Sequence, residues 1–263
     1  MKPFHISVYT APERGFFTNS LLIEGPTDAL LIDAQFLKSD ARKVADIIRA
    51  SHKNLVMIFI THGHPDHYMG LETLLQSFGT AVPTTTRLIS DQIRFSSRQY
   101  IDQYKPVFKS DLSDNAVVPA VLPSTTILFE GQELRVIELG PGESAQNAAL
   151  FLPSQKTLIA GDAVYNKVHL WLTEDNAEGW IRNIQALKEI RGVTTVYPGH
   201  GEPGGTELFD EMLRYLKTFI DVCGNATSKD TAFAEMASLF PEYRLPVFLE
   251  LSLSTRMELP APK

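Results

Sequence analysis

Residues 55–67 read LVMIFITHGHPDH, a short apolar run that leads into a dense group of ionisable side chains. A continuous apolar run of this length is typical of a strand that is covered on both faces. Three of the seven histidines of the chain and one aspartate follow within residues 62–67. Without a bound cation, burying these groups together would raise the free-energy cost of each one. The stretch therefore predicts a metal site at the carboxyl end of a buried strand.

Three other predicted strands end in a similar way. Glu143, Asp162 and His200 each follow a short apolar run, in a turn that contains glycine. Ligand sites in open α/β sheets gather at the carboxyl ends of strands. If these strand ends lie side by side, seven potential ligands converge, namely His62, His64, Asp66, His67, Glu143, Asp162 and His200. Nitrogen and oxygen ligands without thiolates suit zinc, and also iron or manganese.

The remaining pattern indicates paired strands followed by alternating strands and helices. The expected strands are 4–9, 19–24, 29–33, 55–60, 127–129, 134–139, 148–152, 157–160 and 193–197, and the expected helices are 40–50, 71–78, 84–110, 175–191 and 208–223. Asp175 and Glu178 are spaced like a capping box at the start of one of these helices. Residues 111–125 are expected to form a loop, and the last forty residues to be mostly helical with a break at Pro241. This order predicts a layered α/β protein with a mixed sheet.

Composition excludes several classes of protein. The chain has 263 residues, a formal net charge of −7 and 44% hydrophobic residues, which is ordinary for a globular protein and argues against a nucleic-acid or anionic-membrane partner. No stretch reaches the roughly 18 consecutive apolar residues of a membrane span. The N-terminus lacks the apolar region of a signal peptide, and the single cysteine, Cys223, lies on the apolar stripe of its helix. We therefore expect one compact domain in the cytoplasm, where thiols stay reduced.

Residues 62–67 resemble the HxHxDH signature of the metallo-β-lactamase superfamily. Gly161-Asp162 is similar to the family's later bridging aspartate, and Gly199-His200-Gly201 to its last histidine. The resemblance covers about residues 4–225 and implies an αββα sandwich, in which two mixed sheets flanked by helices hold the metals at one edge. It also implies a single domain over 1–263, with a helical insertion near 84–125 and a helical C-terminal extension over 226–263.

The resemblance also implies a ligand set for two divalent metal ions. His62 and His64 would bind the first metal, Asp66, His67 and His200 the second, and Asp162 would bridge both. The family normally adds a histidine to the first metal in a Gly-His-Thr-like turn, and the matching turn here reads Gly142-Glu143-Ser144. Glu143 is then either a ligand or a solvated loop carboxylate beside a weakly held first metal. We favour ligation because the glycine and the position are kept.

The implied reaction is hydrolysis of a carbonyl substrate (a lactone, lactam, ester or thioester) by a metal-bound hydroxide. Asp66 would orient the hydroxide and carry a proton. Tyr165 would donate a hydrogen bond to the developing oxyanion, or it is a packed aromatic residue beside the core. We expect a pocket lined by Phe16, Phe17, Tyr68, His169 and Trp171, with His169 a bystander to the metals. An aromatic pocket favours a small-molecule substrate that is uncharged or hydrophobic.

Three alternatives stay open on the sequence. The first is a thioesterase of the glyoxalase II kind, the second a mononuclear iron oxygenase on the same fold, and the third a metal-binding protein without turnover. A phosphodiester nuclease would need basic residues near the metals, and the nearest one after Asp162 is Lys167. Residues 84–130 resemble an insertion that shapes either the pocket or a homo-oligomer contact, and the sequence does not choose between these roles.

Overall fold

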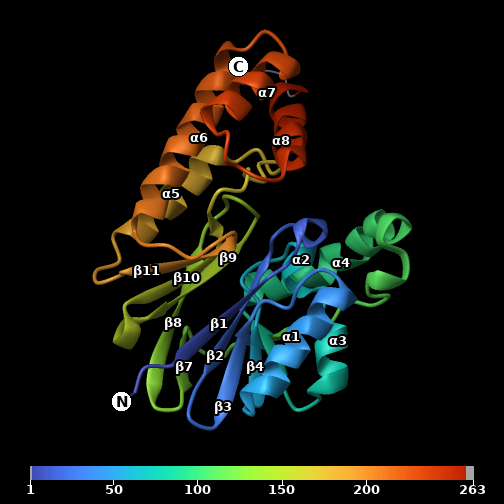
Figure 1. Cartoon of the computed structure of the whole chain (residues 1–263), viewed down its shortest axis with the longest axis vertical. Helices are drawn as coiled ribbons and strands as arrows, with labels where there is room; N and C mark the ends of the chain where they lie inside the picture. The colour runs from blue at the N-terminus through green and yellow to red at the C-terminus, as the bar shows by residue number, and fades with distance from the viewer. Residues whose placement is uncertain (1, 259–263) are drawn as a thin grey trace.

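The computed structural model describes residues 2–258, which form two β-sheets face to face with helices on their outer faces (Figure 1). The first sheet has the order β1-β2-β3-β4-β5-β6, and the second has the order β11-β10-β9-β8-β7. The strands of the first sheet are β1 His5–Thr10, β2 Asn19–Glu24, β3 Asp28–Ile32, β4 Asn54–Phe59, β5 Val82–Thr85 and β6 Ala120–Val121. Those of the second are β7 Thr126–Phe129, β8 Gln132–Leu139, β9 Asn147–Leu152, β10 Thr157–Tyr165 and β11 Thr195–His200.

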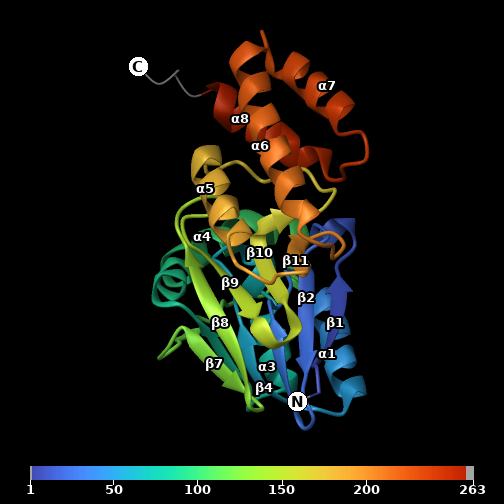
Figure 2. The same cartoon turned by 90° about the vertical axis from the view of Figure 1, so that its left-hand side faces the viewer.

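Helices complete the outer layers. Those beside the first sheet are α1 Lys38–Ser51, α2 Pro65–Tyr68, α3 Leu71–Ser77 and α4 Arg87–Phe108. Those beside the second sheet and beyond it are α5 Ala177–Lys188, α6 Glu207–Asn225, α7 Lys229–Leu239 and α8 Pro246–Glu258. Figure 2 shows α6, α7 and α8 together at the end of the molecule opposite the start of β1. Both sheets mix parallel and antiparallel pairs, so the predicted αββα sandwich is confirmed.

The two sheets are joined at one edge by backbone pairing. His62 forms an isolated bridge with Asn147, and Thr18 forms one with His200. The amide of Ala148 also donates to the carbonyl of Thr61 at 2.8 Å. Both bridges include a predicted metal ligand, so the backbone itself holds the ligand-bearing strand ends of the two sheets side by side.

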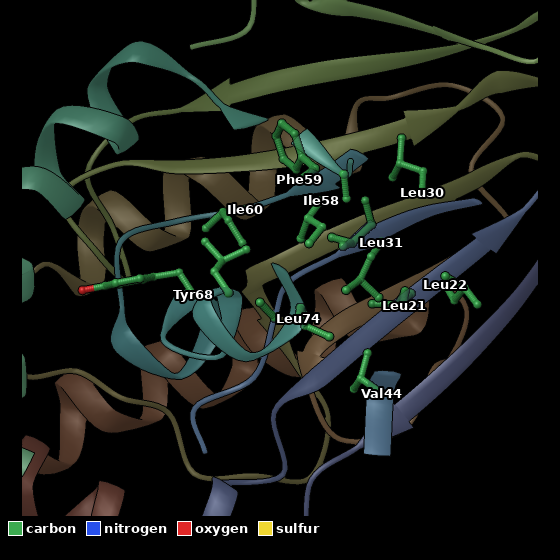
Figure 3. Packing of buried hydrophobic residues seen from close by; sticks show 14 of the residues in the cluster. Leu21, Leu22, Leu30, Leu31, Val44, Ile58, Phe59, Ile60, Tyr68 and Leu74 are labelled. Carbon is green, nitrogen blue, oxygen red and sulfur yellow. The ribbon is translucent and has the colours of Figure 1, made fainter. Parts of the chain in front are cut away.

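The apolar core encloses the part of β4 that leads to this edge. Ile58 and Phe59 of β4 are fully buried and lie near Leu30 and Leu31 of β3 (Figure 3). The expectation that β4 is covered on both faces along its whole length is wrong, because Val56 is 37% exposed. Only the carboxyl half of the strand, which leads into the histidine loop, is enclosed by its neighbours.

Several boundaries differ from the sequence prediction. The predicted strand 157–160 continues to Tyr165, because β10 keeps pairing with β11 past a register shift at Gly161. The capping box of the helix after residue 175 is wrong. Helix α5 begins at Ala177, and the side chain of Asn176 accepts from the amide of Gly179. Asp175 instead pairs with Arg256 of α8 at 2.8 Å.

The predicted insertion contains strands as well as a helix, and the predicted extension contains two helices. The region near 84–125 begins in β5 and contains α4, and it returns to the first sheet in β6, where a loop was expected. The C-terminal extension contains α7 and α8, and its helical break includes Pro241 as predicted. Residues 259–263 of that prediction lie outside the described residues. Within residues 2–258, no helix combines the length and the apolar character needed to cross a membrane.

Candidate metal centre

All seven predicted ligands lie together at the edge where the two sheets meet. They form two groups in which one possible ligand atom from each residue lies within 4.8 Å of the others. The first group is His62, His64, Glu143 and Asp162, and the second is Asp66, His67 and His200. The loop after β4 and helix α2 supply the motif residues, β10 and β11 supply Asp162 and His200, and the turn between β8 and β9 supplies Glu143. Every member is at most 8% exposed, so all are screened from bulk water.

The first group has the spacing of a small cation site. Nδ1 of His64 lies 2.8 Å from Oε1 of Glu143, and Nε2 of His62 lies 3.6 Å from Oε2 of the same carboxylate. Nε2 of His62 also lies 3.7 Å from Oδ2 of Asp162. Ligands of a tetrahedral metal with bonds of about 2.0–2.1 Å are separated by about 3.3 Å. The observed separations lie around that value.

The second group is equally close and shares Asp162 with the first. Nε2 of His67 lies 3.3 Å from Oδ2 of Asp66, and Nε2 of His200 lies 3.4 Å from the same oxygen. Oδ1 of Asp162 is 3.2 Å from His67, and Oδ2 is 3.0 Å from His200. Asp162 therefore contacts both groups, as a bridging ligand would.

Unpaired polar atoms test whether this cluster fits a metal. Among the described residues, Nε2 of His62 and of His67, Oε2 of Glu143 and Oδ1 of Asp162 are buried without a hydrogen-bond partner. Buried polar atoms are otherwise almost always paired, because an unpaired one loses its hydration without compensation. Four such atoms in one cluster, all nitrogen or carboxylate oxygen, fit divalent cations.

Asp33 fixes two of the histidines from behind, and the sequence reasoning missed it. Its Oδ2 accepts from Nδ1 of His67 at 2.8 Å and from the hydroxyl of Thr61 at 2.8 Å. Because that hydroxyl donates its hydrogen to Asp33, it accepts a hydrogen bond from Nδ1 of His62 at 3.1 Å. Both rings are thereby held as tautomers whose Nε2 lone pair faces the cluster. Asp33 ends an apolar strand, which is the same sequence signal that marked the ligands.

The other two histidines are also held by their second nitrogen. Nδ1 of His200 donates to the carbonyl of Phe16 at 2.7 Å. Nε2 of His64 lies 3.5 Å from Oε1 of Glu174, which leaves Nδ1 of that ring toward Glu143. Partners of this kind orient metal-binding imidazoles and raise their basicity. A backbone carbonyl leaves no mark in the sequence, so the Phe16 contact could not have been predicted.

Hydrogen bonds also orient the carboxylates. The hydroxyl of Tyr165 donates to Oδ2 of Asp162 at 2.7 Å and lies 3.5 Å from Glu143. Burial and the charge of Asp162 raise the pKa of Tyr165, so it stays a neutral donor. The hydroxyl of Thr18 donates to Oδ2 of Asp66 at 2.8 Å. Burial raises the pKa of Glu143 to about 7, against the opposing pull of the His64 imidazole.

A cavity of about 300 Å³ opens onto the cluster. Of the five residues expected to line it, Phe16 and Trp171 do so. Phe17 is a correction, because the guanidinium of Arg244 covers its ring at 4.0 Å from the centroid. Tyr165, which the sequence analysis named, also lines the cavity. Several side chains of α4 and α8 line it as well, and the sequence analysis did not name them.

Tyr68 and His169 are also corrections, because neither lines the cavity. Tyr68 is fully buried in the core beside the first sheet, where Figure 3 shows it near Ile60 and Leu74. Nδ1 of His169 lies 2.8 Å from the hydroxyl of Tyr215, on the side of the helices α6–α8. Its expected role as a bystander to the metals agrees with this position.

A histidine and carboxylate cluster at the common edge of two facing mixed sheets defines the class of the molecule as a metal-centre protein of αββα architecture. A model of the metallo-beta-lactamase superfamily matches residues 14–200, which is more than half of the chain, and the chain belongs to that superfamily. It is therefore an enzyme, a metal-dependent hydrolase.

Characterised relatives of the chain are distant. Metallo-beta-lactamase IND-1 of Chryseobacterium indologenes is 24% identical over 77% of this chain and 80% of its own length. The hydroxyacylglutathione hydrolase of Brucella anthropi is 24% identical over 89% of this chain and 78% of its own. A metallo-beta-lactamase from Pontibacter korlensis has a TM-score of 0.63 at 23% identity, over 81% of this chain and 94% of its own. The structural likeness shows the shared fold.

Proposed function

We propose that the protein hydrolyses a carbonyl substrate, namely a lactone, lactam, ester or thioester, with two divalent metal ions. His62, His64 and Glu143 would hold one ion, Asp66, His67 and His200 the other, and Asp162 both. The set of unpaired buried nitrogen and carboxylate atoms carries the proposal. Zinc suits these ligands and their near-tetrahedral spacing. It is also the metal in the mono-zinc form of FIM-1 from Pseudomonas aeruginosa. FIM-1 shares the fold at a TM-score of 0.60, with 16% identity over 81% of this chain and 90% of its own.

Glu143 is the unusual member of the proposed ligand set. The alternative of a solvated loop carboxylate is wrong, because the side chain is 1% exposed and faces His62 and His64. An anionic ligand in place of an imidazole would make the first metal a slightly weaker Lewis acid. Metal analysis of Glu143→Ala should show the bound stoichiometry falling, and unchanged metal content would refute ligation.

The chain's own residues would position the reaction. When bound, the metal pair supplies Lewis acidity and lowers the pKa of water to about 7. Asp66 lines the cavity, and Thr18 fixes its Oδ2, so this carboxylate is placed to hold a proton during turnover. Tyr165 already donates to Asp162, which favours a positioning role over donation to an oxyanion.

A thioester hydrolase is the second candidate. The observation that favours it is the match to the hydroxyacylglutathione hydrolase, which extends over 89% of this chain. A glutathione thioester carries carboxylates, however, and no lysine or arginine lines the cavity within the described residues. We therefore expect a small uncharged substrate rather than a glutathione thioester.

The decisive experiment combines metal analysis with a panel of chromogenic lactone, lactam, ester, thioester and phosphodiester substrates. Chelator-sensitive cleavage of a carbonyl substrate that zinc or manganese restores would support the proposal. Oxygen consumption by the iron-loaded protein, or bound metal without cleavage of any carbonyl substrate, would contradict the proposal. His64→Ala and Asp162→Ala should each remove nearly all activity, whereas the exposed-residue control His5→Ala should retain it.

Three further predictions remain proposals. We propose a single domain, because the two sheets share one edge and one ligand cluster. A cytoplasmic location rests on the single cysteine. A homo-oligomer is a prediction that light scattering of the purified protein would test.

A further inference from the structure

Helices α4 and α8 form the apolar walls of the cavity above the metal centre. Phe108 of α4 and Phe248 of α8 both contact the ring of Phe16, at centroid distances of 6.3 Å and 5.5 Å. The carbonyl of Phe16 in turn accepts from His200. A single residue thus connects the apolar walls to the proposed second metal. Helix α8 lies outside residues 14–200, which the superfamily model matches.

The apolar wall continues to the mouth of the cavity. Val107 of α4 is 66% exposed, and Val247 and Leu251 of α8 are 45% and 43% exposed, yet all three line the cavity. Two helices therefore present apolar side chains to solvent around one opening. An exposed apolar rim that continues into a pocket is typical of a binding site for an apolar group.

Apart from the proposed histidine ligands, the ionisable side chains around the cavity that carry charge at neutral pH are carboxylates. Its walls include the carboxylates of Asp66, Glu143, Asp162 and Glu174, and no lysine or arginine of the described residues lines it. Glu174 stands beside His64, with 40% of its side chain exposed. Two divalent ions that carry a hydroxide would balance the three buried carboxylates, and Glu174 and the apolar rim would offer no partner to a carboxylate on the substrate.

We propose that α4 and α8 form a subsite for the apolar group of a neutral carbonyl substrate, with the scissile carbonyl at the metal centre. The inference rests on the proposed hydrolytic function. The subsite would hold an uncharged acyl or aromatic group attached to the carbonyl. It separates this enzyme from hydrolases of common lactam antibiotics and of glutathione thioesters, because those substrates carry carboxylates.

The test uses matched substrates with the same scissile bond. We expect kcat/KM to rise at least about tenfold from 4-nitrophenyl butyrate to the octanoate. It should fall by at least about tenfold for the ester of octanedioic acid, which has the same chain length and a terminal carboxylate. Equal rates for the three esters would overturn the subsite while leaving hydrolysis intact.

Variants of the exposed rim test the location without disturbing the core. Val107→Asp and Leu251→Asp should each lower kcat/KM for the octanoate about tenfold more than they lower it for the butyrate. Leu251→Lys should raise kcat/KM for the octanedioate ester. Matched controls are Phe95→Asp on α4, which is 83% exposed, and Leu239→Asp on α7, which is 48% exposed, because neither residue lines the cavity. A control variant as damaging as the rim variants would overturn the assignment.

Equilibrium binding separates this inference from the proposed function. Octanamide and its counterpart with a terminal carboxylate can be titrated into the metal-loaded protein by calorimetry, which needs no turnover. If octanamide binds more tightly than the charged amide and Val107→Asp weakens that binding, the subsite is supported. This holds even if no ester is cleaved, and in that case only the hydrolytic proposal is lost. Equal or tighter binding of the charged amide would overturn the subsite.

Discussion

Asp33 acts at the scale of a single residue by holding two histidines in one tautomer. It accepts from Nδ1 of His67 directly and reaches His62 through the hydroxyl of Thr61. Asp33→Asn replaces one acceptor oxygen with a donor and keeps the volume. Loss of such an outer partner costs metal ligation about 10–100-fold. We expect metal affinity to fall by that factor, measured by competition with a chromogenic chelator.

The control for this substitution is Asp46→Asn, which changes an exposed carboxylate paired with Arg49. It should leave metal affinity unchanged. Asp33 is a positioning residue, so the loss should appear in metal binding even when the folded state survives. An Asp33→Asn protein that is folded and binds metal as tightly as the unchanged protein would contradict the role.

Gly199 is required by the close approach of Asp162. A Cβ atom on Gly199 would lie 1.7 Å from Oδ1 of that carboxylate, well inside van der Waals contact. Gly199→Ala must therefore displace the one carboxylate that contacts both ligand groups. We predict loss of at least one bound metal and of nearly all activity. Gly224→Ala is the matched control, since nothing lies within 4 Å of a Cβ there.

Sequence reasoning found the residues of the candidate metal cluster and missed most of their hydrogen-bond partners. His62, Asp162 and His200 carry a local signal, because each lies in a glycine-containing segment that directly follows a short apolar run. The carbonyl of Phe16 and the hydroxyl of Thr18 carry none, because their roles depend on how distant strands are placed in space. The position of Tyr68 shows the same limit, since a neighbour of the motif in sequence is turned into the core.

At the scale of elements, the segment after β10 is held against the last three helices by His169. Its amide donates to the carbonyl of Arg244, and its Nδ1 pairs with Tyr215 of α6. Burial lowers the pKa of His169 from 6.5 to about 4. The unfolded chain therefore binds a proton between pH 6.5 and 4 that the folded chain does not, so stability falls as the pH falls through this window.

We predict that this histidine accounts for up to about 3 kcal/mol of stability lost between neutral pH and pH 4. His169→Asn keeps a polar atom near Nδ1 and cannot titrate. Its free energy of unfolding, measured by urea at several pH values, should decline less steeply than that of the unchanged protein. Parallel curves for the two proteins would show that burial of this ring is not linked to protonation.

The ends of the elements were harder to predict than their existence. The apolar run of β10 stops at Ala160, yet the strand continues to Tyr165 because parallel pairing with Pro198 and His200 replaces the lost apolar signal. Helix α5 starts at Ala177 because the amide oxygen of Asn176 satisfies its first turn. Asp175 was the better candidate on spacing alone, but its carboxylate is engaged by Arg256 of another helix.

At the scale of the whole molecule, the candidate metal centre lies where the two layers of the sandwich meet. His62, His64, Asp66 and His67 follow β4 of the first sheet, and the other three proposed ligands come from the second sheet and its β8–β9 turn. The fold class followed from the strand order and the superfamily resemblance. The meeting of α4 and α8 over the cavity did not, because no periodicity in either helix identifies its distant partner.

Because the metals would tie both sheets together, their removal should lower the stability of the whole chain. Chelation leaves three buried carboxylates and the unpaired imidazole nitrogens without compensation. A ligand present at about a thousandfold over its Kd stabilises a protein by about 4 kcal/mol. For a chain of this size that corresponds to a fall in Tm of roughly 10 °C, measured by calorimetry with and without chelator. Asp162→Ala should lose this response and His5→Ala should keep it, whereas an unchanged Tm on complete metal removal would show that the sheets do not depend on the centre.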